Sequence, residues 1–261
     1  MIVASSISGY NKEGFNEKLL EDDMKQQHLL SYVRRAIQDY DMIQEGDHIA
    51  VGISGGKDSL ILALALSYLR RFYPKKFEVI GVTVSLGFDN FDLSQVQKFF
   101  DKIQVPFYIC ETQIGKIIFD ERKESNPCSL CSKMRKGALY DYAKDLGCNK
   151  IALGHNKDDI NETLMMSLLY EGRIHTMAPV TYMDQVDMHI IRPLIYVPEC
   201  DIRGFVRKEN LPVVKSPCPV DGKTKREDIK QLIYSIQKDI PKVQEHLFGA
   251  IQRSTISGWE R

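Results

Sequence analysis

The chain carries no net charge, because 35 lysines and arginines balance 35 aspartates and glutamates among its 261 residues. The charge balance therefore does not indicate a nucleic-acid binder, and RNA binding has to be argued from a site. No continuous apolar stretch approaches the roughly 20 residues that span a bilayer. The first residues also lack the positively charged and apolar regions of a secretory signal. We therefore expect a cytoplasmic protein with no membrane partner.

Cysteine is sparse, with six residues in the whole chain. Without a secretory signal a disulfide framework is not expected, so metal or redox chemistry is the default interpretation of spaced cysteines. Cys128 and Cys131 stand in PCSLC, at the spacing of two thiolates that bind one metal, and Cys218 stands in SPCP. The other three lie in or beside apolar segments, where we expect small buried hydrophobes: Cys110, Cys148 and Cys200.

A pair of cysteines with a third cysteine elsewhere in the sequence leaves three interpretations of their role open. Structural zinc normally takes four ligands, and no fourth is obvious. A redox disulfide between Cys128 and Cys131 leaves Cys218 unexplained. A [4Fe–4S] cluster on three cysteines leaves one iron open for a substrate or for sulfide.

Apolar stretches that read as strands alternate with amphipathic stretches along the chain. This alternation predicts an α/β fold with a parallel sheet and helices on both faces. We divide the chain into an N-terminal extension (1–27), a main domain (28–217) and a C-terminal segment with two helices (218–261). The expected strands are 48–54, 77–86, 105–112, 150–155 and 188–195, and the expected helices of the main domain are 28–43, 60–73, 93–103, 128–147, 159–172 and 199–210.

A phosphate-binding loop is indicated by SGGKDS, which lies directly between a strand and a helix. Glycine allows the backbone to approach an anion closely, and the helix N-terminus presents unpaired N–H groups. The pattern is not a Walker A loop, which would need glycine at Val51 and Ser or Thr at Asp58. Asp58 has two compatible interpretations, as a cap of the helix or as a Mg²⁺ ligand. The six residues expected to bind the nucleotide phosphates are Ser54, Gly55, Gly56, Lys57, Asp58 and Ser59.

These motifs occur in the order IAVGISGGKDS, PCSLC, GHNKDD, IRPLIY and SPCP. The combination closely resembles the TtcA family of tRNA 2-thiocytidine synthetases, and more distantly the TtuA and NcsA group of tRNA 2-thiouridine synthetases. The resemblance covers about residues 28–220. It implies a Rossmann-like PP-loop domain, ATP with Mg²⁺, a homodimer, and a [4Fe–4S] cluster on Cys128, Cys131 and Cys218.

The resemblance also assigns roles to residues outside the loop. GHNKDD follows a strand, at the sheet edge where open α/β sheets bind ligands. Capping of a helix explains its two acids on physical grounds, whereas the resemblance implies an acid–base or metal role for Asp159. Gly154 and His155 would lie close to the nucleotide. Arg135 would stabilise phosphate or substrate, because arginine keeps its charge but does not readily shuttle a proton.

The function implied is an ATP-dependent tRNA sulfurtransferase. The C2 oxygen of a cytidine at anticodon-loop position 32 would attack the ATP α-phosphorus, with Lys57, Arg135 and Asp159 as catalytic residues. Sulfide on the open iron would then displace AMP. The implied partners are tRNA and a sulfur donor, either a cysteine desulfurase or inorganic sulfide.

One residue departs from the resemblance. Position 221 is aspartate, where the bacterial 2-thiocytidine enzymes carry a second CxxC. This departure leaves thiolation of uridine open as an alternative. Two further alternatives are a PP-loop ligase that acts on a small molecule with purely structural zinc, and a non-catalytic iron–sulfur or redox sensor. The intact SGGKDS and GHNKDD argue against the sensor, which would need neither.

Overall fold

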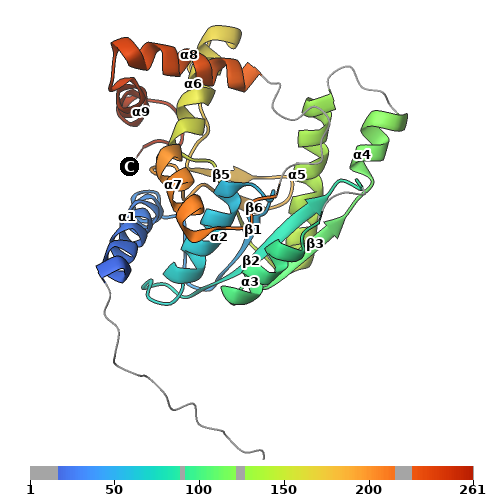
Figure 1. The fold of residues 1–261 in the computed structure, drawn as a ribbon. Helices are drawn as coiled ribbons and strands as arrows, with labels where there is room; N and C mark the ends of the chain where they lie inside the picture. The colour runs from blue at the N-terminus through green and yellow to red at the C-terminus, as the bar shows by residue number, and fades with distance from the viewer. Residues whose placement is uncertain (1–16, 89–91, 122–126, 215–224, 261) are drawn as a thin grey trace, which may run out of the picture.

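A computed structural model describes residues 17–88, 92–121, 127–214 and 225–260. Its described residues form one six-stranded sheet in the order β3-β2-β1-β4-β6-β5 (Figure 1). All neighbouring strands are parallel except β5, which pairs antiparallel with β6. The strands are β1 (Asp47–Gly52), β2 (Phe77–Ser85), β3 (Phe107–Glu111), β4 (Lys150–Ala152), β5 (Val180–Met183) and β6 (Met188–Ile191).

Helices cover both faces of the sheet, as predicted. On one face, apolar residues of β1 pack in a common core with α1, α2, α3 and α7. On the other face, Ala50 and Ile151 pack against α4, α5 and the π-helical turn η1. These elements are α1 (Glu17–Asp39), α2 (Lys57–Leu69), α3 (Ser94–Lys102), α4 (Ile114–Lys116), η1 (Ile117–Glu121), α5 (Pro127–Asp145) and α7 (Glu199–Glu209). No helix in the described ranges is long and apolar enough to cross a membrane.

The C-terminal helices pack on α6 (Lys157–Glu171) and not on the sheet. Ile229 and Ile233 of α8 (Lys225–Asp239) form a small apolar cluster with Val243 of α9 (Val243–Arg253). Phe248 of α9 and Trp259 beyond it join the main core. The three segments that we proposed from the sequence remain an expectation about domain organisation.

Several elements differ from the sequence prediction. α1 begins at Glu17 and ends at Asp39, earlier at both ends than the expected helix 28–43. α2 begins at Lys57, three residues earlier than expected, so it incorporates the end of the glycine loop. Strand β5 was not predicted, since it is short and lies at the sheet edge with mostly half-exposed residues. Helix α4 and η1 were also missed.

The strand order places the functional motifs together. The chain moves outward from β1 to β2 and β3, and then returns to place β4 on the other side of β1. The carboxyl ends of β1 and β4 therefore meet at a topological switch point, where open α/β sheets bind ligands. SGGKDS follows β1, and GHNKDD follows β4.

Candidate active site

The loop after β1 leaves the N-terminus of α2 open to an anion. Gly55 has φ +80°, a conformation that favours glycine, and Gly56 occupies the N-cap position without a side-chain cap. The Ser54 Oγ accepts from the Gly56 N–H at 3.2 Å, and the Ser59 Oγ donates to the Gly56 carbonyl at 2.9 Å. These bonds hold the loop in shape, while the first N–H groups of α2 lack a capping side chain and suit a phosphate.

Asp58 does not cap α2, so that part of the sequence prediction is wrong. It lies one residue inside the helix, after Lys57. Its Oδ1 accepts from the Asn156 Nδ2 at 2.9 Å, and its Oδ2 pairs with the Lys57 Nζ at 2.9 Å. Each oxygen accepts from one neighbouring donor, and a carboxylate has further lone pairs, so a metal ion at Asp58 would share the group with these partners.

The segment after β4 packs directly against this loop. A Cβ on Gly154 would lie 3.0 Å from the Asp58 carbonyl carbon and 3.1 Å from the Ser59 nitrogen, both backbone atoms. Asn156 then caps α6, accepting from the N–H groups of Asp158 and Asp159. The Asp159 carboxylate accepts in return from the Asn156 N–H at 2.9 Å, which completes a capping box. Capping, the alternative interpretation of these acids, is therefore observed for Asp159, and burial raises the pKa of its carboxyl group.

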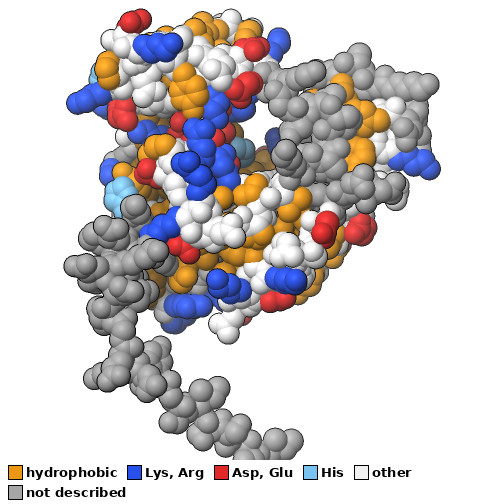
Figure 2. Space-filling view, in the orientation of Figure 1, with side chains coloured by type: hydrophobic (Ala, Val, Ile, Leu, Met, Phe, Trp, Pro, Cys, Tyr) orange, Lys and Arg blue, Asp and Glu red, His pale blue; other side chains and the backbone are white. Residues whose placement is uncertain are grey.

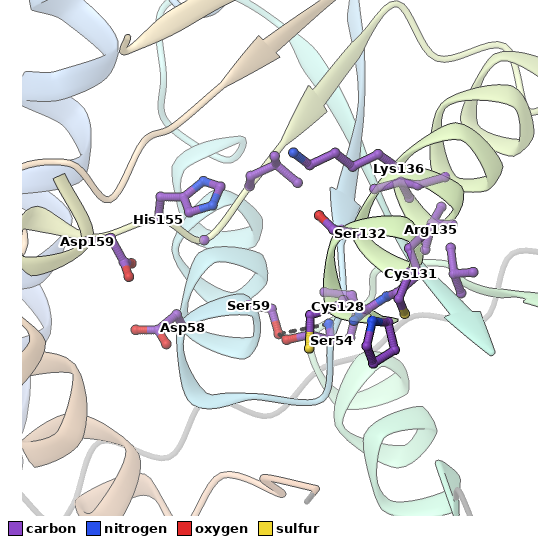
Figure 3. A pocket seen from close by; sticks show the side chains of 18 of the residues that line it. Ser54, Asp58, Ser59, Cys128, Cys131, Ser132, Arg135, Lys136, His155 and Asp159 are labelled. Atoms are coloured by element: carbon purple, nitrogen blue, oxygen red, sulfur yellow. Dashed lines mark hydrogen bonds between the residues drawn. The ribbon is translucent and has the colours of Figure 1, made fainter. Parts of the chain in front are cut away.

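Both segments line one cavity of about 500 Å³ (Figure 3). Asp58, His155 and Asp159 lie on one side, at the starts of α2 and α6, and the cysteine helix α5 forms the opposite side. The predicted residues that line the cavity are Ser54, Asp58, Ser59, Cys128, Cys131, Arg135, Gly154, His155 and Asp159. Gly55, Gly56 and Lys57 do not line it.

The paired cysteines stand in the first turn and a half of α5, which begins at Pro127. Cys128 is exposed and Cys131 is half-buried, and both line the cavity. Cys218 lies outside the described residues. The chain approaching it is anchored at the loop, since the Val214 N–H donates to the Gly55 carbonyl at 3.0 Å.

Two basic side chains and one histidine also line the main cavity. Arg135 and its neighbour Lys136 are exposed on α5 and line the cavity. The His155 Nδ1 is buried without a hydrogen-bond partner. Burial, reinforced by the charges of Arg192, Arg226 and Lys136, lowers the pKa of His155 to about 3. His155 is therefore a neutral ring that presents an unused nitrogen at neutral pH.

The comparison with known proteins shows the family of this chain. A family model described as a PP-loop domain matches residues 25–236. The chain belongs to the PP-loop family. Curated relatives named tRNA-cytidine(32) 2-sulfurtransferase include one from Geobacter sulfurreducens, 36% identical over 88% of this chain and 91% of the relative. Another, from Teredinibacter turnerae, is 38% identical over 90% of this chain and 78% of the relative. This PP-loop protein is thus a member of the tRNA-cytidine 2-sulfurtransferase family.

A solved structure supports the same fold. It is the U34-tRNA thiolase NcsA from Methanococcus maripaludis with its [4Fe–4S] cluster, with a TM-score of 0.70 and 23% sequence identity. The match covers 87% of this chain and 78% of that chain. At this identity the likeness establishes the fold alone, and it confirms the predicted Rossmann-like PP-loop architecture.

A second, smaller cavity of about 170 Å³ adjoins the first in this PP-loop protein and shares Asp58 and Asp159 with it. Lys57 lines this cavity, where its Nζ lies 2.9 Å from a Glu199 oxygen. Arg226 contacts Glu162 at 3.2 Å and donates to the Asp159 carbonyl. Asn156 and Asp158 of this cavity belong to the GHNKDD motif. Sequence reasoning assigned no site role to four other charged members, which come from three helices: Glu162, Glu199, Arg226 and Lys230.

The remaining cysteines differ in burial. Cys148 is buried as predicted, and burial raises its pKa to about 11. Cys110 is half-buried in β3. The prediction is wrong for Cys200, which is exposed because it lies in the first turn of α7 beside the buried Glu199. None of these three lines the main cavity. Within the described residues, no group of three or more His, Cys, Asp or Glu side chains is arranged to hold a metal.

Proposed function

We propose that this chain is an ATP-dependent tRNA sulfurtransferase that replaces the C2 oxygen of a cytidine, at anticodon-loop position 32, with sulfur. The observation that carries the proposal is the shared cavity, which brings an open helix N-terminus and two cysteines to the same space. The names of the relatives supply the substrate, because they act on cytidine 32 of tRNA.

The residues present fit an iron–sulfur cluster. Cys128 and Cys131 face the cavity from one helix turn, and thiolates are the ligands that such clusters take. Cys218, the third expected ligand, is four residues beyond Val214 in the sequence. When bound, the cluster would supply an iron with an open position for the incoming sulfur. Mg²⁺ would bind at Asp58, whose carboxylate is a hard oxygen ligand.

The chain's own residues support adenylation first. The start of α2, with Ser54 and Ser59, would hold the pyrophosphate that leaves as the C2 oxygen attacks the α-phosphorus. Arg135 on the opposite wall would offset negative charge on the phosphorus, and preorganised charge of this kind is usually the largest catalytic contribution. Asp159, with its raised pKa, would exchange a proton at the reacting base. AMP then leaves as sulfur takes its place.

The target base would have to be splayed out of its stack to enter the cavity, as single-stranded RNA loops permit. The exposed Arg135 and Lys136 lie at the cavity on α5, where they would meet loop phosphates. The homodimer and the identity of the sulfur donor remain expectations from the family resemblance.

Nucleoside mass spectrometry tests this function. The full chain, reconstituted anaerobically with iron and sulfide, is incubated with ATP, Mg²⁺, sulfide and a tRNA transcript that carries cytidine at position 32. We expect 2-thiocytidine after digestion, and none without ATP or with adenosine at position 32. A product of 2-thiouridine would redirect the assignment to uridine, and the absence of any thionucleoside would refute it.

A further inference from the structure

Glu199 binds the loop lysine outside the main cavity. The Lys57 Nζ lies 2.9 Å from Glu199 Oε1 and 2.9 Å from Asp58 Oδ2, and it lines the smaller cavity behind the loop. The side chain of Glu199 is only 7% exposed. A carboxylate so buried remains charged only when it is well paired. In this position, the Lys57 ammonium contacts two carboxylates, and Lys57 does not line the main cavity.

The two oxygens of Glu199 have different partners. Oε1 faces Lys57, whereas Oε2 lies 2.7 Å from the Lys230 Nζ and 3.2 Å from an Arg203 nitrogen. A run of Lys and Arg side chains is visible between α8 and α7 (Figure 2). Burial would raise the pKa of Glu199, but hydrogen bonds from Lys230 and Lys57 outweigh burial and hold it at about 2.

From this division we infer that Glu199 is a positioning residue that holds Lys57 in a resting position, and that Lys230 allows Lys57 to leave. ATP would draw the Lys57 ammonium to its β- and γ-phosphates, which compete with the carboxylates. Glu199 then keeps Lys230 and Arg203 on its other oxygen, so the departure of Lys57 leaves no unpaired buried charge. The four-carbon stem of lysine permits this movement. The inference rests on the proposed function only in that ATP binds at the SGGKDS loop.

A double-mutant cycle on ATP affinity tests the resting position. Titration calorimetry of the full chain with Mg·ATP measures the dissociation constant for the wild type, Glu199→Gln, Lys57→Met and the double variant. Glu199→Gln removes a competitor of the phosphates, so it should tighten ATP binding roughly three- to ten-fold. In the Lys57→Met background the same change should have no effect. Glu209→Gln, at the exposed end of α7, is the matched control and should match the wild type.

Lys230→Met tests the second part. With Lys230 absent, Glu199 depends more on Lys57, so ATP binding should weaken roughly three- to ten-fold, again only when Lys57 is present. Weaker ATP binding by Glu199→Gln, or an effect that persists without Lys57, would overturn the inference, because both indicate a structural role. Thermal unfolding of each variant verifies that it is folded. If wild-type protein binds ATP but makes no thionucleoside, the proposed function fails and this inference stands.

Discussion

At the scale of single residues, the five cysteines within the described ranges divide into two that line the cavity and three that do not. Replacing Cys128 or Cys131 by serine should abolish thionucleoside formation while ATP binding is retained, because the phosphate loop is built from other residues. Thionucleoside yield and ATP affinity measure these two effects, and the iron content of each variant is measured as a third property. Cys200→Ser, an exposed position outside the cavity, is the control and should retain all three. A full thionucleoside yield from the Cys128→Ser variant would show that the Cys128 thiol takes no part in the reaction.

His155 makes stability depend on pH. Its pKa is about 3 in the folded chain, below the ordinary value of 6.5, so the unfolded chain binds more protons between these values. The free energy of unfolding should therefore fall as pH decreases from 6.5, by up to about 1.4 kcal/mol per pH unit from this residue. Urea denaturation at several pH values should show a shallower fall for His155→Gln. An unchanged slope in the variant would mean that the ring titrates normally in the folded protein.

At the scale of elements, Asn156 joins the starts of two helices. Its Oδ1 caps α6, and its Nδ2 donates to Asp58 at the start of α2. Asn156→Ala should lower the free energy of unfolding by about 1–2 kcal/mol, the usual cost of losing an N-cap. It should also weaken ATP binding, since Asp58 loses a hydrogen bond.

Urea denaturation and calorimetry measure the two effects of Asn156→Ala. Ser235→Ala, which removes an exposed hydroxyl bonded to the Leu232 carbonyl, is the control and should change neither by more than a small amount. If Asn156→Ala lowers stability but leaves ATP affinity unchanged, the role of Asn156 is limited to capping α6.

Elements with a strong apolar period could be predicted from the sequence, and those without one could not. β1 and α2 were predicted within a few residues because buried residues dominate both. β5 escaped because an edge strand of four residues with one exposed and three half-buried positions lacks a distinct pattern. The site follows the same rule, because the site residues that belong to a sequence motif were predicted and those outside a motif were not. Glu199 and Lys230 were missed because their pairing is a property of helix packing and not of spacing along the chain.

At the scale of the whole molecule, the C-terminal residues complete the main core. Trp259, the single tryptophan, is 1% exposed and packs edge-on against Tyr40 and Phe248 at 5.8 and 5.6 Å between ring centroids. Its Nε1 donates to the Met177 carbonyl at 3.2 Å. One residue near the end of the chain thus ties α1, α9 and the segment before β5 together.

Trp259→Ala should lower the free energy of unfolding by about 3–5 kcal/mol, the usual cost of deleting a buried aromatic side chain. Circular dichroism during urea denaturation measures this loss, with Leu169→Ala, an exposed position on α6, as the control. In the wild type, the tryptophan fluorescence should change in the same transition as the circular dichroism, because the C-terminal segment shares the main core. An earlier fluorescence transition would show that the C-terminal segment unfolds separately.

We propose that one cavity both activates a tRNA base with ATP and supplies its sulfur. The most direct measurement is a single turnover with excess reconstituted protein, labelled ATP and a tRNA transcript carrying cytidine 32, in which AMP and 2-thiocytidine are quantified together. We expect the two products to appear in equal amounts, and neither to form without tRNA. Formation of 2-thiocytidine with ADP, or with no nucleotide product, would contradict it.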